Sequence, residues 1–485
     1  MADRIITFQY AKDNYEAYKK QTIPASNECM TKADVSAYLN ADMSVLSSYN
    51  NNQLVPRVKF SPILTGGFNS DISDMILQSD GKIVVVGYFS QFNTVTTNCI
   101  IRLNSDGTRD TSFNIGSGFN NYPYGIVQQT DGKFVIIGAF TSYNGVSANR
   151  IIRLNLDGSV DTSFNTGSGF NNMSTKIAIQ SDNKVIITGH FTSYNGSSIN
   201  RIIRLNSDGT RDTSFNIGSG FDNIATKIVI QSDNKVIITG NFTSYNGSSI
   251  NRIIRLNSNG TRDTSFNPGS GFINDYVING LGVLSNGQII VAGSFDRYNG
   301  VLCPMMIKLN SNGTRDTSFK FNRTGTSSNF ISAIHITLDL INGDKITIAV
   351  YNSSTNSSAL ERYLHNGSFN TAILTGSSSN SVNGRISAIH VLKSNPVDLY
   401  LLSGLFTRLN TSSGNIPANG IIRIDSNGNK DNTFNYGTGF SGIPVGARVI
   451  IFQTNGKYLL GGGFIVYNGT TANRIVRLNQ DGTIG

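Results

Sequence analysis

One phrase recurs eight times along this 485-residue chain and constrains what the chain can fold into. The first copy reads Arg-Leu-Asn-Ser-Asp-Gly-Thr-Arg-Asp-Thr-Ser-Phe-Asn from Arg102, and intact copies follow at intervals of 51 residues. The later copies, first intact and then degenerate, begin at Arg153, Arg204, Arg255, Lys308, Arg362, Arg423 and Arg477. A fixed period near fifty predicts stacked supersecondary units that bury their apolar faces against each other. A phrase present in every copy describes the scaffold, so we do not expect it to form an active site.

The copy over residues 123–173 shows what each unit builds. Two runs of β-branched and apolar residues, 124–129 and 134–140, flank Asp131-Gly132, a dipeptide typical of a hairpin with a type I′ turn. A third run covers residues 150–155, and the short run 161–165 is the expected fourth strand. Four antiparallel strands in about fifty residues predict one blade of a β-propeller.

The predicted fold is therefore all-β: a β-propeller of eight blades with four antiparallel strands each. Seven blades are the alternative, with residues 330–375 or 376–430 as an insertion. The last copy stops at Gly485 before its Ser-Phe-Asn piece, while residues 59–69 contain a spare Gly-Phe-Asn. An N-terminal strand would thus complete the last blade and remove an exposed edge.

Two domains follow from this repeat pattern. Residues 59–485 form the propeller, and residues 1–58 form a small α+β appendage. In the appendage, Thr31 caps a short helix that has Asp34 as its third residue. So few residues bury little core of their own. We expect the appendage to dock onto the propeller or onto a partner, or to serve as a passive cap on the first blade.

Composition excludes several classes of function. The net charge is +9, but the arginines recur once or twice per repeat instead of clustering, so nucleic-acid binding is not expected. Cys29, Cys99 and Cys303 form neither a disulfide framework nor a zinc pattern. The first residues lack the pattern of a signal peptide, and no stretch approaches the roughly 20 apolar residues of a membrane span. We expect a chain made without a secretion signal and without membrane insertion.

The phrase, together with the following Gly-x-Gly-Phe, the Gln-x-Asp-Gly-Lys turn and the Gly-x-Phe-Thr-x-Tyr-Asn-Gly turn, resembles the delta-60 repeat. This is a β-propeller repeat of bacterial surface and secreted proteins and of some phage proteins. The resemblance covers residues 59–485. It implies the propeller architecture and an extracellular or virion setting, and it brings no catalytic residue to carry over.

A second resemblance concerns residues 27–56. They are similar to a short module at the start of structural proteins from Bacteroidetes and their phages, the crAss-like phages among them. The resemblance implies that this segment attaches the chain to a particle. The candidate attachment residues in it are Cys29, Thr31, Tyr38, Leu39, Tyr49, Leu54 and Val55.

A tyrosine recurs beside Asn-Gly in equivalent loops and is the candidate binding residue. Exposed rings could offer planar surfaces to glycans or protein partners, because one face is apolar and the hydroxyl stays in water. The alternative is that each ring packs against the adjoining blade. The candidates are Tyr143, Tyr194, Tyr245, Tyr298 and Tyr467.

The phrase itself has two plainer interpretations. Asn104, Asp106 and Asp110 around Gly107 faintly resemble a calcium loop, but other copies place asparagine at the central position, which a turn tolerates better than a cation site does. Arg153 and Asp161 would pair inside their blade, as would their counterparts in other copies. We expect turns and scaffold here, and neither a metal nor a cofactor.

No enzyme is predicted, because the four histidines lack a metal spacing and no nucleophile elbow is present. The expected function is that of a phage virion structural protein of the tail region, present in several copies and contacting other virion proteins, a host receptor or a glycan. A bacterial surface adhesion or glycan-binding module is the alternative, and a glycan-active enzyme is a third. Binding is expected where the repeat breaks down, at residues 1–58, 296–306 and 372–418, the last of which should lengthen a loop.

Overall fold

The computed structural model describes residues 67–485, except residues 106, 273–277, 304, 320, 322–328, 338–343, 394–396, 442–445 and 454–455. All the described residues lie in one compact unit, Met43–Gly485. They form strands and turns, and no helix occurs among them. The predicted appendage, its boundary at residue 58 and all seven attachment residues lie outside the described residues.

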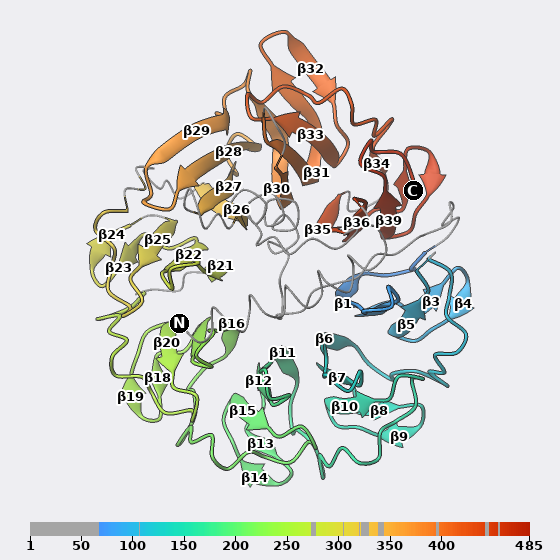
Figure 1. Ribbon diagram of the computed structural model, residues 1–485, viewed down its shortest axis with the longest axis vertical. Coiled ribbons are helices and arrows are strands. Elements are labelled where there is room, and N and C mark those ends of the chain that lie inside the picture. The colour runs from blue at the N-terminus through green and yellow to red at the C-terminus, as the bar shows by residue number, and fades with distance from the viewer. Residues whose placement is uncertain are drawn as a thin grey trace, which may run out of the picture. The chain divides into compact units, whose positions relative to one another are not determined.

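Most repeats build a small antiparallel sheet, and the first strand of each repeat lies nearest the centre of the unit (Figure 1). The inner strands are β1 (Ile72–Leu77), β6 (Pro123–Gln128), β11 (Ser174–Ile179), β16 (Ala225–Ile230), β21 (Ile278–Val283), β26 (Asn329–Thr337), β30 (Ser381–Leu392) and β35 (Ala447–Phe452). The middle strands are β2 (Ile83–Gly87), β7 (Phe134–Gly138), β12 (Val185–Gly189), β17 (Val236–Gly240), β22 (Ile289–Gly293), β27 (Lys345–Asn352), β31 (Leu399–Thr411) and β36 (Tyr458–Gly462). The third strands are β5 (Ile100–Leu103), β10 (Ile151–Leu154), β15 (Ile202–Leu205), β20 (Ile253–Leu256), β25 (Met306–Leu309), β28 (Ser357–Leu364), β33 (Ile421–Asp425) and β39 (Ile475–Leu478). We call each set of inner, middle and third strands a blade and name it by its inner strand.

Short two-residue strands lie at the periphery of most blades. They pair as β3 (Gln91–Phe92) with β4 (Val95–Thr96), β8 (Ser142–Tyr143) with β9 (Val146–Ser147), β13 (Ser193–Tyr194) with β14 (Ser197–Ser198), β18 (Ser244–Tyr245) with β19 (Ser248–Ser249), β23 (Arg297–Tyr298) with β24 (Val301–Leu302), and β37 (Val466–Tyr467) with β38 (Thr470–Thr471). β34 (Phe440–Ser441) pairs with β37, β29 (Phe369–Leu374) with β28, and β32 (Gly414–Pro417) with β31. For the described residues, this confirms an all-β architecture of repeated, propeller-like blades.

The outer strand of the repeat is not where the sequence predicted it. Residues 161–165 form turns, and the nearest pairing is the single bridge between Leu154 and Val160. The reason is a local turn, in which Asp161 Oδ1 accepts hydrogen bonds from the amide and the hydroxyl of Ser163. This local turn replaces ladder hydrogen bonds. The Ser142–Tyr143 and Val146–Ser147 pair forms the periphery instead.

The turn at the Asp-Gly signal of the repeat also differs from the predicted type. At Asp131-Gly132 only Gly132 has a positive φ (85°), as in a type I turn followed by a left-handed glycine. The type I′ hairpin lies at the other signal, where Asn144 (47°) and Gly145 (76°) both have positive φ and join β8 to β9. Asparagine and glycine adopt this backbone at little cost.

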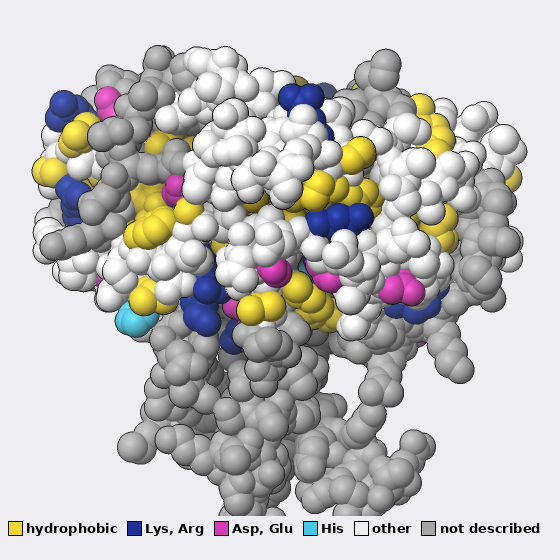
Figure 2. All heavy atoms as spheres, turned by 90° about the horizontal axis from the view of Figure 1, so that it is seen from above, with side chains coloured by type: hydrophobic (Ala, Val, Ile, Leu, Met, Phe, Trp, Pro, Cys, Tyr) yellow, Lys and Arg dark blue, Asp and Glu magenta, His cyan; other side chains and the backbone are white. Residues whose placement is uncertain are grey.

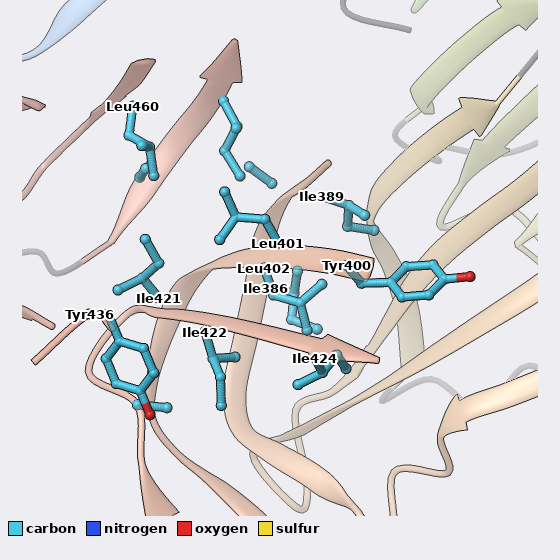
Figure 3. Packing of buried hydrophobic residues seen from close by; sticks show 14 of the residues in the cluster. Ile386, Ile389, Tyr400, Leu401, Leu402, Ile421, Ile422, Ile424, Tyr436 and Leu460 are labelled. Carbon is cyan, nitrogen blue, oxygen red and sulfur yellow. The ribbon is translucent and has the colours of Figure 1, made fainter. Parts of the chain in front are cut away.

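The core lies between neighbouring blades. In β7 and β12 every residue is buried, because both faces of these strands pack against other blades. Between the blades of β30 and β35, Leu401 of β31 and Leu460 of β36 belong to the same core cluster, and Figure 3 shows them between the two sheets. Alternation along β31 sends Leu402, the partner of Ile422 on β33, to the opposite face.

Residues 372–418 do not form the long loop that their Ser, Asn and Gly content predicted. This range contains the longest of the described strands, β30 with 12 residues and β31 with 13. Apolar residues alternate with the small polar ones, and Val382 and Leu409 face each other in the ladder. Backbone hydrogen bonds join β26 to β33 into one continuous eight-stranded sheet, in which β28 and β30 share only the pair Ser358 and Val382.

The blade of β1 meets the blade of β35, so the ends of the described chain lie side by side. The amide of Phe68 donates to the carbonyl of Asn473 at 2.8 Å, and Arg474 Nη1 donates to the carbonyl of Phe68 at 2.6 Å. Leu459 and Ile475 share a core cluster with Phe68. The spare Gly-Phe-Asn piece thus contacts the last blade at Gly67 and Phe68, while the predicted strand before it lies outside the described residues.

Candidate functional site

The five candidate tyrosines lie inside the blades. Tyr143 is 1% exposed, and its hydroxyl donates to the carbonyl of Gly158 at 2.8 Å. Burial raises the pKa of the Tyr143 phenol well above its ordinary value. The equivalent pairs are Tyr194 with Gly209, Tyr245 with Gly260, Tyr298 with Gly313 and Tyr467 with Gly482. This is the packing alternative, and rings buried in this way present no planar surface to a ligand.

The repeated phrase forms a buried ion-pair network that joins neighbouring blades. Arg153 Nε donates to Asp161 Oδ2 at 2.7 Å, and Lys133 Nζ approaches the same oxygen at 2.9 Å. Arg153 Nη1 also donates to the carbonyl of Ser207 in the next blade. The same pairing recurs as Arg102 with Asp110, Arg204 with Asp212, Arg255 with Asp263, Lys308 with Asp316 and Arg423 with Asp431. The predicted pairing of Arg153 and Asp161 as scaffold is confirmed.

These contacts set the ionisation of the aspartates. Burial alone would raise the pKa of Asp161, but hydrogen bonds from Lys133 and Ser163 and the charge of Arg153 hold it well below the ordinary value. In Asp316 the same competition, with Lys308 as the cation, lowers the pKa to about 2. The carboxylates therefore stay charged at neutral pH, as buried members of an ion pair must.

The loop that faintly resembled a calcium site is a turn. The Asn104 amide donates to the carbonyl of Thr108 at 2.8 Å, and the Gly107 amide donates to the carbonyl of Asn104 at 2.9 Å. The carboxylate of Asp110 forms ion pairs with Arg102 and Lys82. Asp106 lies outside the described residues. Across the part of the chain that the structure describes, no group of three or more His, Cys, Asp or Glu residues is arranged to hold a metal ion.

An exposed aromatic cluster lies where the blades of β1 and β6 meet. Tyr88, which follows β2, is 41% exposed, and Tyr122, which precedes β6, is 42% exposed. Their ring centroids are 4.7 Å apart, and Tyr124 lies 6.2 Å from Tyr88. We call Tyr88, Tyr122 and Tyr124 the tyrosine cluster. It lies on the starting face, the side of the blades on which the inner strands begin.

Sequence reasoning missed this cluster because it searched for a tyrosine that recurs. The signal was a departure from the repeat: the positions of Tyr122 and Tyr124 hold Met173 and Thr175 one repeat later. Ala139 stands where the first repeat has Tyr88. Three aromatic residues in one place, against Ala139, Met173 and Thr175 at the matching positions one repeat later, are not required by the scaffold.

Charged side chains also interrupt the inner strands near the starting face. Asp74 on β1, Lys176 on β11 and Lys227 on β16 occupy the same register position in their blades, each paired with the residue before the last of the middle strand. Burial raises the pKa of Asp74 to about 6, against the lowering effect of its hydrogen bonds and of Lys176. Burial and then the charge of Lys176 lower the pKa of Lys227.

Two histidines, which no motif singled out, lie together in the core. His335 on β26 and His390 on β30 have ring centroids 5.7 Å apart, and His390 stacks on Phe452 at 5.1 Å. Burial lowers the pKa of His335 to about 4 and that of His390 to about 3. Both are therefore neutral at physiological pH. Cys99 and Cys303 are buried free thiols, far apart in the chain.

Charges on the molecular surface are dispersed. Figure 2 shows, on one side of the molecule, lysine and arginine side chains in small separate groups among uncharged polar ones. This distribution agrees with the regular spacing of arginine in the sequence. The described residues include no helix with the length and hydrophobicity that a membrane span requires.

Solved structures similar to this chain include several propellers. The β-propeller domain of the Trilobed protease from Pyrococcus furiosus is 10% identical over 78% of this chain and 96% of that chain, with a TM-score of 0.34. The Dos1 propeller is 10% identical over 88% and 93% of the two chains, with a TM-score of 0.33. A prolyl endopeptidase is 10% identical over 88% of this chain but only 54% of its own length, with a TM-score of 0.38. TM-scores this low carry no argument about function.

No curated protein matches the chain. A family model does, and it is described as a domain of unknown function (DUF5122) beta-propeller. It matches residues 78–113, 129–164, 180–215, 231–266, 284–319, 401–434 and 453–484, about half of the chain. Six of these matches begin directly after an inner strand, the match 401–434 begins inside β31, and all seven close on the repeated phrase. Sequence period, blade structure and family model agree, and the chain belongs to the DUF5122 β-propeller family.

Proposed function

We propose that this protein is a non-enzymatic binding platform of eight blades, carried in the tail region of a phage particle and attached through residues 1–58. The observation that carries the binding role is the tyrosine cluster. Tyrosine supplies a large contact area together with a hydroxyl that stays in water, and aromatic residues are enriched in the centres of protein interfaces. The location in a particle rests on the resemblance of residues 27–56.

The scaffold suits such a role. The cluster lies where two blades meet, and these blades are joined by Phe119, whose amide donates to the carbonyl of Asn98 at 3.0 Å. Arg102 of the first blade also donates to the carbonyl of Leu156 of the next. The two blades that carry the cluster are thus fixed to each other, so a partner meets a preformed surface and little ordering entropy is lost on binding.

The number of blades is part of the proposal. The continuous sheet of β26 to β33 divides naturally at its weakest point, the lone pair Ser358 and Val382. On one side β26, β27 and β28 repeat the inner, middle and third strand order, and on the other side β30, β31 and β33 do the same. Residues 330–375 and 376–430 then supply one blade each, and neither is an insertion.

The test is photo-crosslinking in intact particles. A photoreactive phenylalanine analogue replaces Tyr88, and a second preparation carries it at Phe369, which is 55% exposed on β29. We expect the chain to sediment with the particles and to crosslink from position 88, but not from position 369, to another virion protein.

Two results would contradict the proposal in different ways. Recovery of the chain from the cell surface or periplasm, without particles, would remove the virion location and favour the bacterial adhesion alternative. Equal crosslinking from both positions would remove the binding role of the cluster. Retention of a host glycan that is lost in Tyr88→Ser would keep the binding role and reassign the ligand.

A further inference from the structure

Asp74 shows how a backbone amide of an inner strand can bind a carboxylate from the preceding blade. Its Oδ2 accepts a hydrogen bond from the amide of Ile126 on β6 at 3.1 Å, and its Oδ1 accepts one from the amide of Met75 at 2.9 Å. Ile126 pairs with Ile136 of the middle strand. Its amide nevertheless points away from that strand, because only alternate residues of an antiparallel strand bond to a given neighbour. The amide edge of an inner strand is therefore a carboxylate site.

The next two inner strands have the same edge without the carboxylate. Ile177 on β11 and Ile228 on β16 hold the register position of Ile126 in their blades. Asp74 lies in the blade that precedes Ile126. The corresponding residue is Gly125 in the blade that precedes Ile177, and Lys176 in the blade that precedes Ile228. Glycine has no side chain, and a lysine ammonium is only a donor. The side chain that corresponds to Asp74 in the preceding blade thus supplies no acceptor at either position.

A lysine directly precedes each of these two isoleucines in the sequence. Lys176 is exposed on β11 and Lys227 is half-buried on β16. Neither forms an ion pair with any described carboxylate. Lys227 is also close enough to Lys176 for the two charges to repel each other. Two like charges on adjacent strands, one of them partly desolvated, cost free energy unless an anion lies between them.

We propose that Lys176 and Lys227, with the strand edges at Ile177 and Ile228, bind a carboxylate side chain of an acidic peptide segment from a partner protein. The carboxylate takes at β11 and β16 the role that Asp74 takes at β6. A carboxylate can accept from an ammonium and a backbone amide together, and such charge-assisted hydrogen bonds are the stronger kind. The site uses none of the residues of the tyrosine cluster, and its test does not depend on whether the chain belongs to a particle.

The experiment measures binding of a fluorescent hexaglutamate peptide to the full chain by anisotropy at low salt, with hexaglutamine as the uncharged probe. We expect hexaglutamate to bind and hexaglutamine not to bind. Lys227→Met and Lys176→Met should each weaken binding about tenfold, since methionine keeps the apolar stem and removes the charge. Asp74→Asn should tighten binding several-fold because it removes the competing negative charge.

The matched control is Lys345→Met, an identical change at the opposite end of the strands, where β27 begins. It should leave the affinity unchanged. A second readout uses the unaltered chain: the peptide should protect Lys176 and Lys227, but not Lys345, from acetylation followed by mass spectrometry. This readout keeps the test valid even if a variant folds poorly.

Three results would overturn the proposal. The affinity for hexaglutamate could be the same in Lys227→Met and in Lys345→Met. The peptide could leave the acetylation of both inner lysines unchanged. Inorganic phosphate could bind through the lysines, as judged by loss in Lys227→Met, while hexaglutamate does not, which would assign the pair to free phosphate instead of an acidic peptide.

Discussion

At the scale of a single residue, Asp161 explains why the repeated phrase is so constant. Its carboxylate accepts from Arg153, Lys133 and Ser163, and Arg153 in turn reaches the next blade. Asp161→Asn removes the charge and leaves a buried guanidinium without its counter-ion. Breaking a buried pair in this way costs about 3 to 5 kcal/mol. We expect a clearly lower urea midpoint for this variant.

The control for that variant is Asp157→Asn in the adjacent turn. Asp157 is exposed, and its Oδ1 accepts from the amide and hydroxyl of Ser159. Asparagine provides the same oxygen and stands at this place in other repeats, as Asn259 shows with Thr261. The urea midpoint should therefore change little. Equal losses in both variants would show that the buried pair is not what stabilises the blade.

Tyr245 provides a second residue-scale prediction. Tyr245→Phe keeps the ring packed against Phe221 at 4.8 Å but removes the donor to the Gly260 carbonyl. The stability should fall by about 1 kcal/mol, the usual net value of one hydrogen bond. The check is thermal unfolding, with Tyr88→Phe on the surface as a control that should leave the melting temperature unchanged.

The contrast between Tyr245 and Tyr88 shows where sequence reasoning reaches its limit. The repeat places Tyr245 next to Asn246-Gly247 and so locates its turn, but the same pattern is compatible with a ring turned outward or inward. Burial against Phe221 depends on a residue of the preceding linker, 24 positions away in sequence and adjacent only in the fold. Tyr88 belongs to no repeated pattern, and its neighbours come from another blade.

At the scale of elements, strands that carry their own pattern were predictable. The β-branched runs of β7 and β10 are buried on both faces and were found from composition alone. The outer strand was misplaced because its residues use side-chain hydrogen bonds that leave no periodicity. The strands β30 and β31 were misread as a loop because their polar residues are stabilised by partners across the ladder, which no local window contains.

The neighbouring inner strands β26 and β30 carry a pH-dependent prediction. Burial lowers the pKa of His335 to about 4 and of His390 to about 3, below the ordinary value of about 6.5. The unfolded chain then binds more protons, so stability is complete above about pH 6.5 and falls as the pH drops toward 4. Between about pH 7.5 and about pH 5, His390→Leu should lose less stability than the unaltered chain, measured as a smaller shift in the urea midpoint.

His190→Leu is the control, because His190 is exposed. This variant should lose as much stability between the two pH values as the unaltered chain. Asp74 has the opposite sign: burial raises its pKa to about 6, so its contribution improves as the pH falls through that range. Asp74 is present in all three proteins and cancels from the comparison. An unchanged pH dependence in His390→Leu would show that the histidine is not buried as described.

At the scale of the whole molecule, one boundary between blades differs from the others. At five other boundaries a linker of the Gly-x-Gly-Phe type, ending at Phe119, Phe170, Phe221, Phe272 or Phe440, carries the chain from one blade to the next. Between the blades of β35 and β1 the described chain makes no such passage, and contact rests on packing and hydrogen bonds around Phe68. Phe68 has the same surroundings as Phe221: rings at 4.4 and 4.9 Å in one case, and at 4.4 and 4.8 Å in the other. The two sites therefore form a matched pair.

Substitution of either phenylalanine by alanine should cost about 3 to 5 kcal/mol, the usual loss for a buried aromatic ring. The location of the damage should differ. After Phe221→Ala the linker keeps the two blades at high effective concentration, so they separate rarely. After Phe68→Ala the boundary can open, and amide hydrogen exchange should rise in both β1 and β39 while β16 stays protected. The opposite result would be an equal rise of hydrogen exchange in both variants, confined to the strands next to the substituted residue. The closure of the ring would then not depend on Phe68, and the closing contacts would lie elsewhere along this boundary.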